Sequence, residues 1–290
     1  MIARTSTNDN ARVRLPNGRT ALLGAAAIYL LLAVANSSHA GTTHRGARDI
    51  SGMWEGFPLS LVFDATVKPG DPQKVVLQPE YDRSYKASLA SKSQSEAAGK
   101  PAADDLTLCM PVGMPAAMSA LFPMEIVATD KVVYMIPEGV DPLRRIYLDG
   151  RSIPALDSLN PTFEGLSIGR WEGNTLVVDT AGVKTRTKTE GVPHSDAMRI
   201  NERIRLLDDD TLEDVITITD PIVFKAPWVI TKLYKDYNTI TTADTPAGKG
   251  IDPGKYPNHG EAELEPSEFV CNENNRNLPG ADGIVGFEGK

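Results

Sequence analysis

The feature that most constrains the fold is a series of short β-rich runs separated by turn residues, which fills the chain from Glu125 to Lys235. Small polar turns at 172–174 and 208–210 join neighbouring runs as hairpins. Because the connections are short, we predict an antiparallel meander rather than alternating strands and helices. The predicted strands are 125–128, 132–136, 144–148, 166–171, 175–180, 198–207, 212–219 and 229–235.

A sheet of this size has to hide its edges, and closure is the usual solution. We therefore predict a mainly β fold, in which the meander forms a curled sheet or a lipocalin-like barrel able to enclose one small ligand. Helices are expected only in the N-terminal part. One spans 80–98, where Tyr81, Tyr85 and Leu89 recur at four-residue spacing, and a shorter one lies within 111–121.

The N-terminus has the composition of a secretory signal. Four arginines precede the apolar run 21–35, and Ser38-His39-Ala40 provides a small-x-small cleavage site. The apolar run is about fifteen residues, short of the roughly twenty that span a bilayer. We expect a signal peptide over 1–40 and a periplasmic or secreted protein, with an uncleaved anchor as the alternative.

The rest of the chain suits one β-rich domain over 41–271. Within it, 236–266 is rich in Gly, Pro, Thr and acidic residues and is predicted to be a long irregular excursion, either functional or disordered. The last residues, 272–290, are expected to form a tail.

The net charge excludes some partners. The whole chain has a formal net charge of −8, and the signal holds four of the 30 Lys and Arg but one of the 38 Asp and Glu, so the remainder reaches −11. Such a surface repels nucleic acid and anionic lipid. Since no second apolar run approaches spanning length, we expect no stable membrane insertion after signal cleavage.

Cys109 and Cys271 are the only cysteines. An even count in an exported chain favours one disulfide, which would contribute roughly 4–5 kcal/mol for a loop of this length. A catalytic thiol is the alternative, and it would need a surrounding that lowers the thiol pKa.

Glu202 is the first candidate for chemistry. With period two, it shares the apolar face of strand 198–207 with Met198, Ile200, Ile204 and Leu206. A carboxyl buried there acquires a raised pKa unless a cation compensates, which makes it a general acid or base candidate. The alternative is a structural ion pair with an inward arginine such as Arg145 or Arg170.

His194 lies in the loop before that strand, where it can exchange protons near neutral pH. We predict Glu202 and His194 as an acid–base pair, with Arg145 or Arg170 stabilising negative charge. A hydrogen-bonded structural histidine is the alternative.

Aromatic residues of the predicted sheet provide a candidate ligand site. Trp171, Tyr147 and Phe163, with Arg170, could bind an apolar or aromatic molecule, although aromatics in a sheet also serve as plain core. No motif has metal-ligand spacing, and we expect neither metal nor cofactor.

Residues 165–169 match the G-x-S-x-G pattern of serine hydrolases, and Ser167, Asp179 and His194 follow the hydrolase order. The motif needs a strand that turns sharply into a helix, whereas another β-rich run follows here. Ser167 is therefore predicted to be an ordinary strand residue.

Longer motifs connect the chain to a family. These are Cys109-Met110-Pro111-Val112-Gly113-Met114-Pro115, Arg145-Ile146-Tyr147-Leu148-Asp149-Gly150-Arg151, the run 167–180, Pro193-His194-Ser195, Glu202-Arg203 and the cysteine-containing run 269–276. With these motifs the chain resembles a large family of exported bacterial proteins of mostly uncharacterised function.

The resemblance implies no reaction, but the recurrence of both cysteine motifs supports the disulfide. The chain departs from the family pattern at Ile153-Pro154, where His-Pro is expected, and at 183–190, where an aromatic and an Asp are expected.

Together these patterns predict an exported protein with a pocket for a small apolar or aromatic molecule. We expect a cofactor-independent enzyme, a lyase, isomerase or hydrolase, that uses acid–base catalysis. The alternatives are a non-catalytic lipocalin-like carrier and an envelope interaction module that uses the acidic excursion.

Overall fold

The computed structural model describes residues 45–58, 62–68, 70–100, 108–119, 123–139 and 142–240. The predicted signal peptide, most of the excursion, the tail and Cys271 lie outside the described residues. The disulfide between Cys109 and Cys271 therefore stays a prediction.

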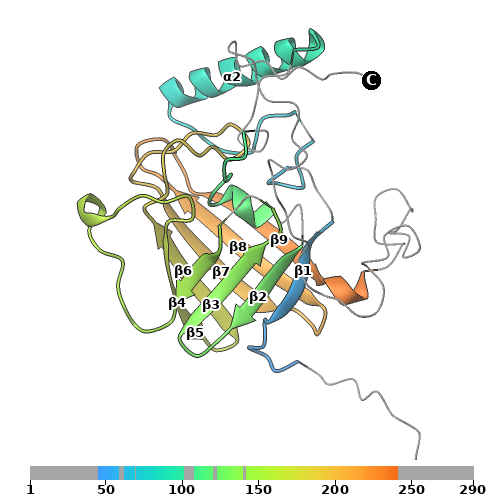
Figure 1. Cartoon of the computed structure of the whole chain (residues 1–290). Helices are drawn as coiled ribbons and strands as arrows, with labels where there is room; N and C mark the ends of the chain where they lie inside the picture. The colour runs from blue at the N-terminus through green and yellow to red at the C-terminus, as the bar shows by residue number, and fades with distance from the viewer. Residues whose placement is uncertain are drawn as a thin grey trace, which may run out of the picture. The chain divides into compact units, whose positions relative to one another are not determined.

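Nine strands form one closed barrel in which neighbours in the chain are neighbours in the sheet (Figure 1). The first strand pairs with both the second and the last, which closes the sheet. The prediction of a mainly β barrel is confirmed. The strands are β1 (Gly52–Phe57), β2 (Met124–Ala128), β3 (Val132–Pro137), β4 (Arg144–Tyr147), β5 (Leu166–Glu172), β6 (Thr175–Ala181), β7 (Arg199–Leu206), β8 (Thr211–Thr219) and β9 (Trp228–Asp236).

Each strand predicted from the sequence is present within a residue or two, and both predicted hairpins join their strands. Strand β1 was missed. It is short and has glycine at its first residue and at Gly56, and it pairs with β9 from the far end of the chain, with Trp54 opposite Asp236. No local pattern reports such a distant pairing.

The pairing of β4 with β5 is parallel, with Ile146 opposite Ser167 and Tyr147 opposite Ile168. The prediction of a wholly antiparallel meander is therefore wrong at this one position. Parallel neighbours need a crossover of a dozen or more residues. The irregular segment 148–165, which contains the short turn η2 (Leu156–Ser158), provides that length.

Alternation along the strands determines what lies inside the barrel. Strand β8 alternates strictly between half-buried and buried residues, and β9 starts and ends with a buried residue and alternates between them. The largest fully buried side chains include Trp54, Tyr234, Met135 and Ile204. The inner face of the barrel is therefore lined mostly by apolar side chains.

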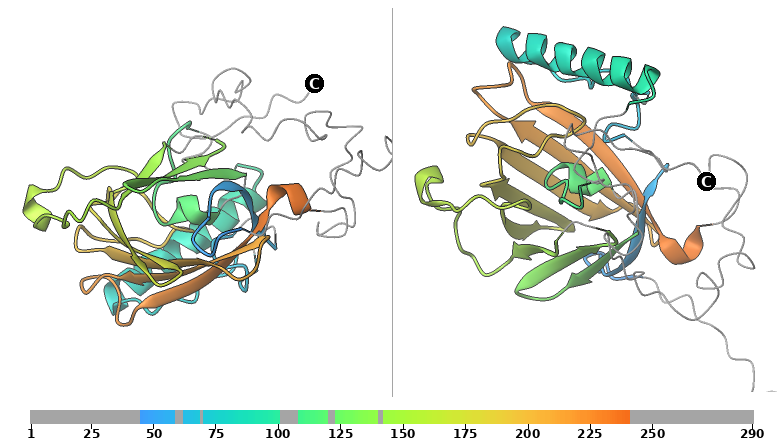
Figure 2. Two further views of the ribbon diagram at one scale, coloured as in Figure 1. Left: turned by 90° about the horizontal axis from the view of Figure 1, so that it is seen from below. Right: turned by 45° about the horizontal axis from the view of Figure 1, so that its top comes forward.

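Of the second predicted helix, only a 3-10 turn over Ala116–Ser119 (η1) is described. The Tyr234 hydroxyl donates to the Met118 carbonyl at 2.8 Å, so η1 packs against the inner face of β9. Figure 2 shows this turn within the ring of strands. It fills part of the barrel end.

The first predicted helix is confirmed as α2 (Pro79–Ala97). Tyr85 is its buried residue, and Tyr81 and Leu89 pack against the core. The Tyr85 hydroxyl accepts a hydrogen bond from the Gln73 N–H at 3.0 Å, which ties the helix to the preceding loop. Among the helices of the described residues, none is long and apolar enough to cross a bilayer.

Candidate functional site

A buried ion pair between Arg144 and Glu202 crosses the barrel interior from β4 to β7. The guanidinium donates to both carboxylate oxygens, with Nη1 to Oε1 at 2.8 Å and Nη2 to Oε2 as the second contact. The side chains are only 3% and 0% exposed. Bidentate geometry of this kind is the strong form of an ion pair.

Further polar groups complete the surroundings of the guanidinium. Its Nε donates to Ser167 Oγ at 3.2 Å and its Nη2 to Thr180 Oγ1 at 3.1 Å. The sulfur atoms of Met118 and Met135 lie 3.4 and 3.7 Å from Nη1. A buried charge pair needs such additional partners to offset its desolvation. Protein groups thus satisfy Arg144, without any need for a ligand.

Asp214 lies beside this pair on the inner face of β8. It pairs with Ile204, while Glu202 pairs with Ile216, so the two carboxyls are diagonal neighbours across β7 and β8. Asp214 is fully buried, and as a carboxylate neither of its oxygens finds a hydrogen-bond donor among the described residues. Few buried carboxylates lack a donor in this way.

Burial raises the pKa of Asp214 well above its ordinary value, and the negative charge of Glu202 raises it further. The barrel therefore contains a carboxylic acid that is protonated at pH values where an exposed aspartate is charged.

Lys232 occupies the position directly opposite Asp214 on β9. Its side chain is buried, and its Nζ donates to the Phe63 carbonyl at 2.8 Å. Burial lowers the pKa of Lys232 to about 8, and the charges of Asp64, Asp214 and Glu190 oppose that shift. Within the described residues, Lys232 forms no ion pair with these carboxylates.

Tyr234 completes the inner face of β9 two residues further on. Burial raises its pKa well above the ordinary value, and the nearby charges of Asp214 and Glu202 add to that effect. Its hydroxyl is therefore a neutral donor, held by the Met118 carbonyl. Glu202, Asp214, Lys232 and Tyr234 are placed by three consecutive strands, and with Arg144 we call them the interior centre.

Of the predicted acid–base pair, Glu202 belongs to the interior centre and His194 does not. His194 is buried in the loop before β7, where its Nε2 lies 3.0 Å from Thr187 Oγ1 and its Nδ1 lies 3.1 Å from the Ser195 carbonyl. Both ring nitrogens thus have partners in the surrounding loop.

The arginine that reaches Glu202 is Arg144 rather than Arg145 or Arg170. Arg145 lies on the opposite, exposed face of β4. Arg170 is also exposed and forms ion pairs with Glu172 and Asp179 on the outside of the sheet. The sequence has two adjacent arginines at this point. Which of them points into the barrel is known only once the register of the strand is known.

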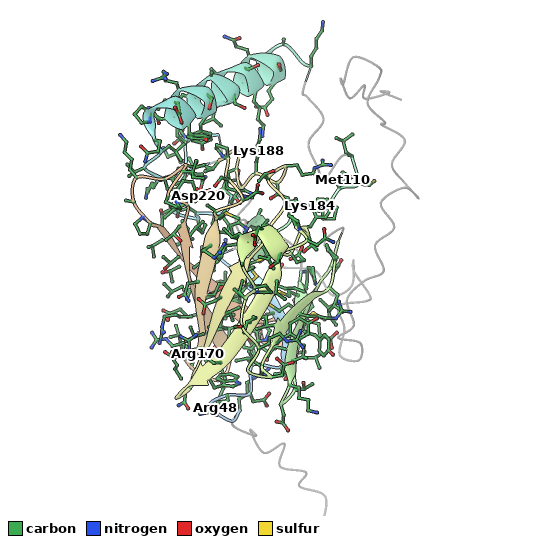
Figure 3. The ribbon with its side chains drawn as sticks, turned by 90° about the vertical axis from the view of Figure 1, so that its left-hand side faces the viewer. Arg48, Met110, Arg170, Lys184, Lys188 and Asp220 are labelled. Carbon is green, nitrogen blue, oxygen red and sulfur yellow. The ribbon has the colours of Figure 1, made fainter. Side chains whose placement is uncertain are left out.

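The structure does not bring the predicted ligand-binding aromatics together. Phe163 precedes β5 and lies 4.5 Å from Lys184 Nζ, measured to the ring centroid, whereas Trp171 is near the other end of β5 beside Arg48. Figure 3 shows the labelled Lys184 and Arg48 at opposite ends of the barrel. Tyr147 is half-buried, and the guanidinium carbon of Arg151 lies 3.8 Å from the centroid of the Tyr147 ring. These residues belong to separate neighbourhoods.

The interpretation of the G-x-S-x-G match is confirmed. Ser167 lies within β5, which continues through a hairpin into β6. Its hydroxyl contacts Thr180 Oγ1 at 2.8 Å and accepts from Arg144. Ser167 therefore supports the ion pair and has the environment of a structural residue.

Asp214 and Lys232 were missed by the sequence reasoning, although the signal that identified Glu202 was available for both. Asp214 shares one face of its strand with Leu212, Ile216 and Ile218. Lys232 likewise shares one face with Trp228, Ile230 and Tyr234. A charged residue at an inward position of an apolar face is the common signal.

The fold and the interior centre define a closed β-barrel with a buried, ionisable core. A comparison with protein-family models, curated proteins and solved structures found no match. The resemblance to exported bacterial proteins stays a prediction. Among the described residues, no three His, Cys, Asp or Glu side chains converge as a metal site.

Proposed function

We propose that this protein is a cofactor-independent enzyme that transfers protons on a small, largely apolar or aromatic molecule, with Asp214 and Lys232 as its acid and base. One observation carries the proposal: within the part of the chain that the structure describes, a fully buried carboxyl without a donor lies opposite a buried lysine without an ion pair. Groups with strongly perturbed pKa values concentrate at functional sites.

The two groups have complementary protonation states. The raised pKa of Asp214 favours its neutral acid form, and Lys232, with a pKa of about 8, exchanges its proton near neutrality. General acid–base catalysis works best when pKa values lie close to the working pH. The pair therefore supports isomerase or lyase chemistry, in which a proton leaves one atom and another is delivered nearby.

Arg144 and Glu202 act as positioning residues in this proposal. The ion pair fixes the position of Glu202, whose negative charge raises the pKa of Asp214. Glu202 is thus not the proton donor itself, and His194 and Arg145 have no assigned role. Apolar residues around the centre, among them Met118 and Met135, favour an apolar substrate.

A lipocalin-like carrier is the second candidate. The observation that favours it is the complete satisfaction of Arg144 by protein groups, which makes the interior a stable, mostly apolar container. In a carrier, Asp214 and Lys232 would orient a ligand without turning it over. Export to the periplasm or beyond remains part of both proposals.

The test compares small molecules, by mass spectrometry, before and after incubation of an aromatic-rich metabolite extract with the purified protein. The same incubation is run with Asp214→Asn and Lys232→Met. Control variants are Glu213→Gln, on the opposite face of β8, and Lys225→Met, an exposed loop residue.

A compound consumed by the parent protein and both controls, and not by Asp214→Asn or Lys232→Met, supports the enzyme. A compound retained by all five proteins and consumed by none supports the carrier. Consumption that persists in both interior variants refutes the assignment of acid and base.

A further inference from the structure

We propose that Lys232 is a nucleophile that forms a Schiff base with a small aldehyde or ketone, so that the substrates of the interior centre are carbonyl compounds. The inference rests on the proposed function and adds the substrate class and a covalent step.

A backbone carbonyl rather than a carboxylate holds the amine. Among the described residues, Lys232 Nζ makes one hydrogen bond, to the Phe63 carbonyl, and an amine can form further bonds. The Phe63 backbone is itself held, because its N–H donates to Glu190 Oε1 at 3.1 Å. The lysine is thus fixed at its end without being neutralised by a salt bridge.

Aromatic rings lie beside the amine. Nζ is 5.4 Å from the centroid of Phe63, whose ring meets Trp228 edge to face at 5.4 Å, and Phe224 meets Trp228 at 6.3 Å. Burial favours the neutral amine, although the Phe63 ring attracts an ammonium, and the aromatic surroundings suit an aromatic carbonyl compound. Lysines that form Schiff bases are activated by this kind of desolvation.

The carboxyl groups that act on the amine are Asp64, Asp214 and Glu190. Asp64 accepts from Thr66 N–H and Thr66 Oγ1 at 2.9 and 2.6 Å, and Glu190 accepts from Phe63. These two have their own donors. Asp214 has none, and it is the group left to exchange a proton with the reaction.

The neutral amine of Lys232 attacks the carbonyl carbon, and one amine proton moves to the oxygen, which gives a carbinolamine. The Asp214 carboxyl donates its proton to that hydroxyl, which leaves as water. The products are a protonated imine on Lys232, the Asp214 carboxylate beside it and one water molecule. The new ion pair replaces two neutral groups.

Benzaldehyde and sodium cyanoborohydride provide the test on the full protein. Hydride from the reductant converts the imine into a stable secondary amine, so each event adds one benzyl group. Intact-mass spectrometry counts the groups, and peptide mapping locates them. We expect one fast addition, at Lys232, before the surface lysines react.

Lys232→Arg keeps a cation but cannot form an imine, and it should lose the fast addition. Lys225→Met should retain it. Circular dichroism checks that each variant is folded. If Lys232→Arg does not fold, the peptide map of the parent protein still decides, because Lys232 must then be modified ahead of every other lysine.

Labelling of surface lysines without preference for Lys232 overturns the inference. The measurements also distinguish a failure of the Schiff-base inference from a failure of the proposed function. Turnover that requires Lys232 but leaves no benzyl or substrate adduct retains acid–base catalysis and removes the imine. A fast adduct at Lys232 without turnover of any extract compound retains the nucleophile and removes the enzyme.

Discussion

Asp214 and Lys232 occupy directly paired positions on β8 and β9, yet these two side chains form no ion pair. In a buried setting, each charged form carries a desolvation penalty that only close contact repays. Without that contact, the pKa of Asp214 rises and that of Lys232 falls to about 8. The two shifts favour the neutral acid and the neutral amine side by side.

The first prediction concerns Asp214→Asn. The folded pKa of Asp214 is raised, so folding takes up a proton above the ordinary aspartate pKa, and stability falls as pH increases through that window. Asparagine has no such titration. Relative to the parent protein, we expect the variant to be more stable near pH 7 than near pH 4. Urea unfolding across pH measures it.

Glu213→Gln is the matched control for this measurement. Glu213 lies on the outer face of β8 and pairs with the exposed Arg205. Exposed pairs contribute about 0–1 kcal/mol. If Asp214→Asn is as destabilising at pH 7 as at pH 4, Asp214 is ionised in the folded protein and the assignment of the proton is wrong.

The second prediction concerns Lys232→Met. Between the folded pKa of about 8 and the ordinary value of 10.5, the unfolded chain binds more protons than the folded one. Stability of the parent protein therefore rises with pH in that window, relative to the variant. The unfolding free energy of the parent, relative to that of the variant, should increase by roughly 2–4 kcal/mol across this window. A difference that stays flat from pH 8 to 10.5 contradicts the lowered pKa.

Thermal or urea unfolding at several pH values provides the data, with Lys225→Met as control. Lys225 is exposed, and its backbone N–H donates to the Val76 carbonyl at 2.8 Å. Its removal should leave the pH profile of stability unchanged.

The third prediction concerns the Arg144–Glu202 ion pair. Removing one partner leaves the other charge buried, which costs about 3–5 kcal/mol. Glu202→Met and Arg144→Met should each lose stability in that range, whereas the double variant with both substitutions should lose much less than the sum. A double-mutant cycle in urea measures the coupling, and additive losses would show that the two side chains are energetically independent.

Alternation along the strands made much of this fold predictable. The inward face of β7, with Ile200, Glu202 and Ile204, follows from period two in the sequence and is buried as predicted. The register was not predictable, and it determines that Arg144 rather than Arg145 reaches Glu202. Strand β1 was not predictable either, because the strands that it pairs with lie far away in the chain.

The interior centre was predictable only in part, for a related reason. A charged residue on an apolar face can be found in one strand, but which faces meet is set by pairing between strands. Asp214 and Lys232 become a pair only once β8 and β9 are in register.

The fourth prediction concerns Cys109 and Cys271. If they form the predicted disulfide, Cys271→Ser should lose roughly 4–5 kcal/mol of stability, because the cross-link constrains a long loop of the unfolded chain. Peptide mapping without reductant should recover the two cysteines in one linked fragment. Free thiols at both positions in protein purified from an oxidising compartment would refute the disulfide.

The last prediction separates packing from chemistry in the G-x-S-x-G segment. Gly165 has a φ of +67°, and a Cβ there would lie 2.7 Å from the Ala181 carbonyl oxygen. Gly173, in the β5–β6 hairpin, has a similar φ of +60° but nothing within 4 Å. Both Gly→Ala variants carry the cost of a positive φ, about 1 kcal/mol, but only Gly165→Ala also has to move backbone.

We expect Gly165→Ala to lose at least about 2 kcal/mol more than Gly173→Ala, since a backbone clash adds to the φ cost. Urea unfolding of the two variants at one pH measures the difference. Equal losses would show that the chain relaxes freely around Gly165. A larger loss at Gly165 means that the glycine is required by the close approach of β6, which accounts for the motif without a serine nucleophile.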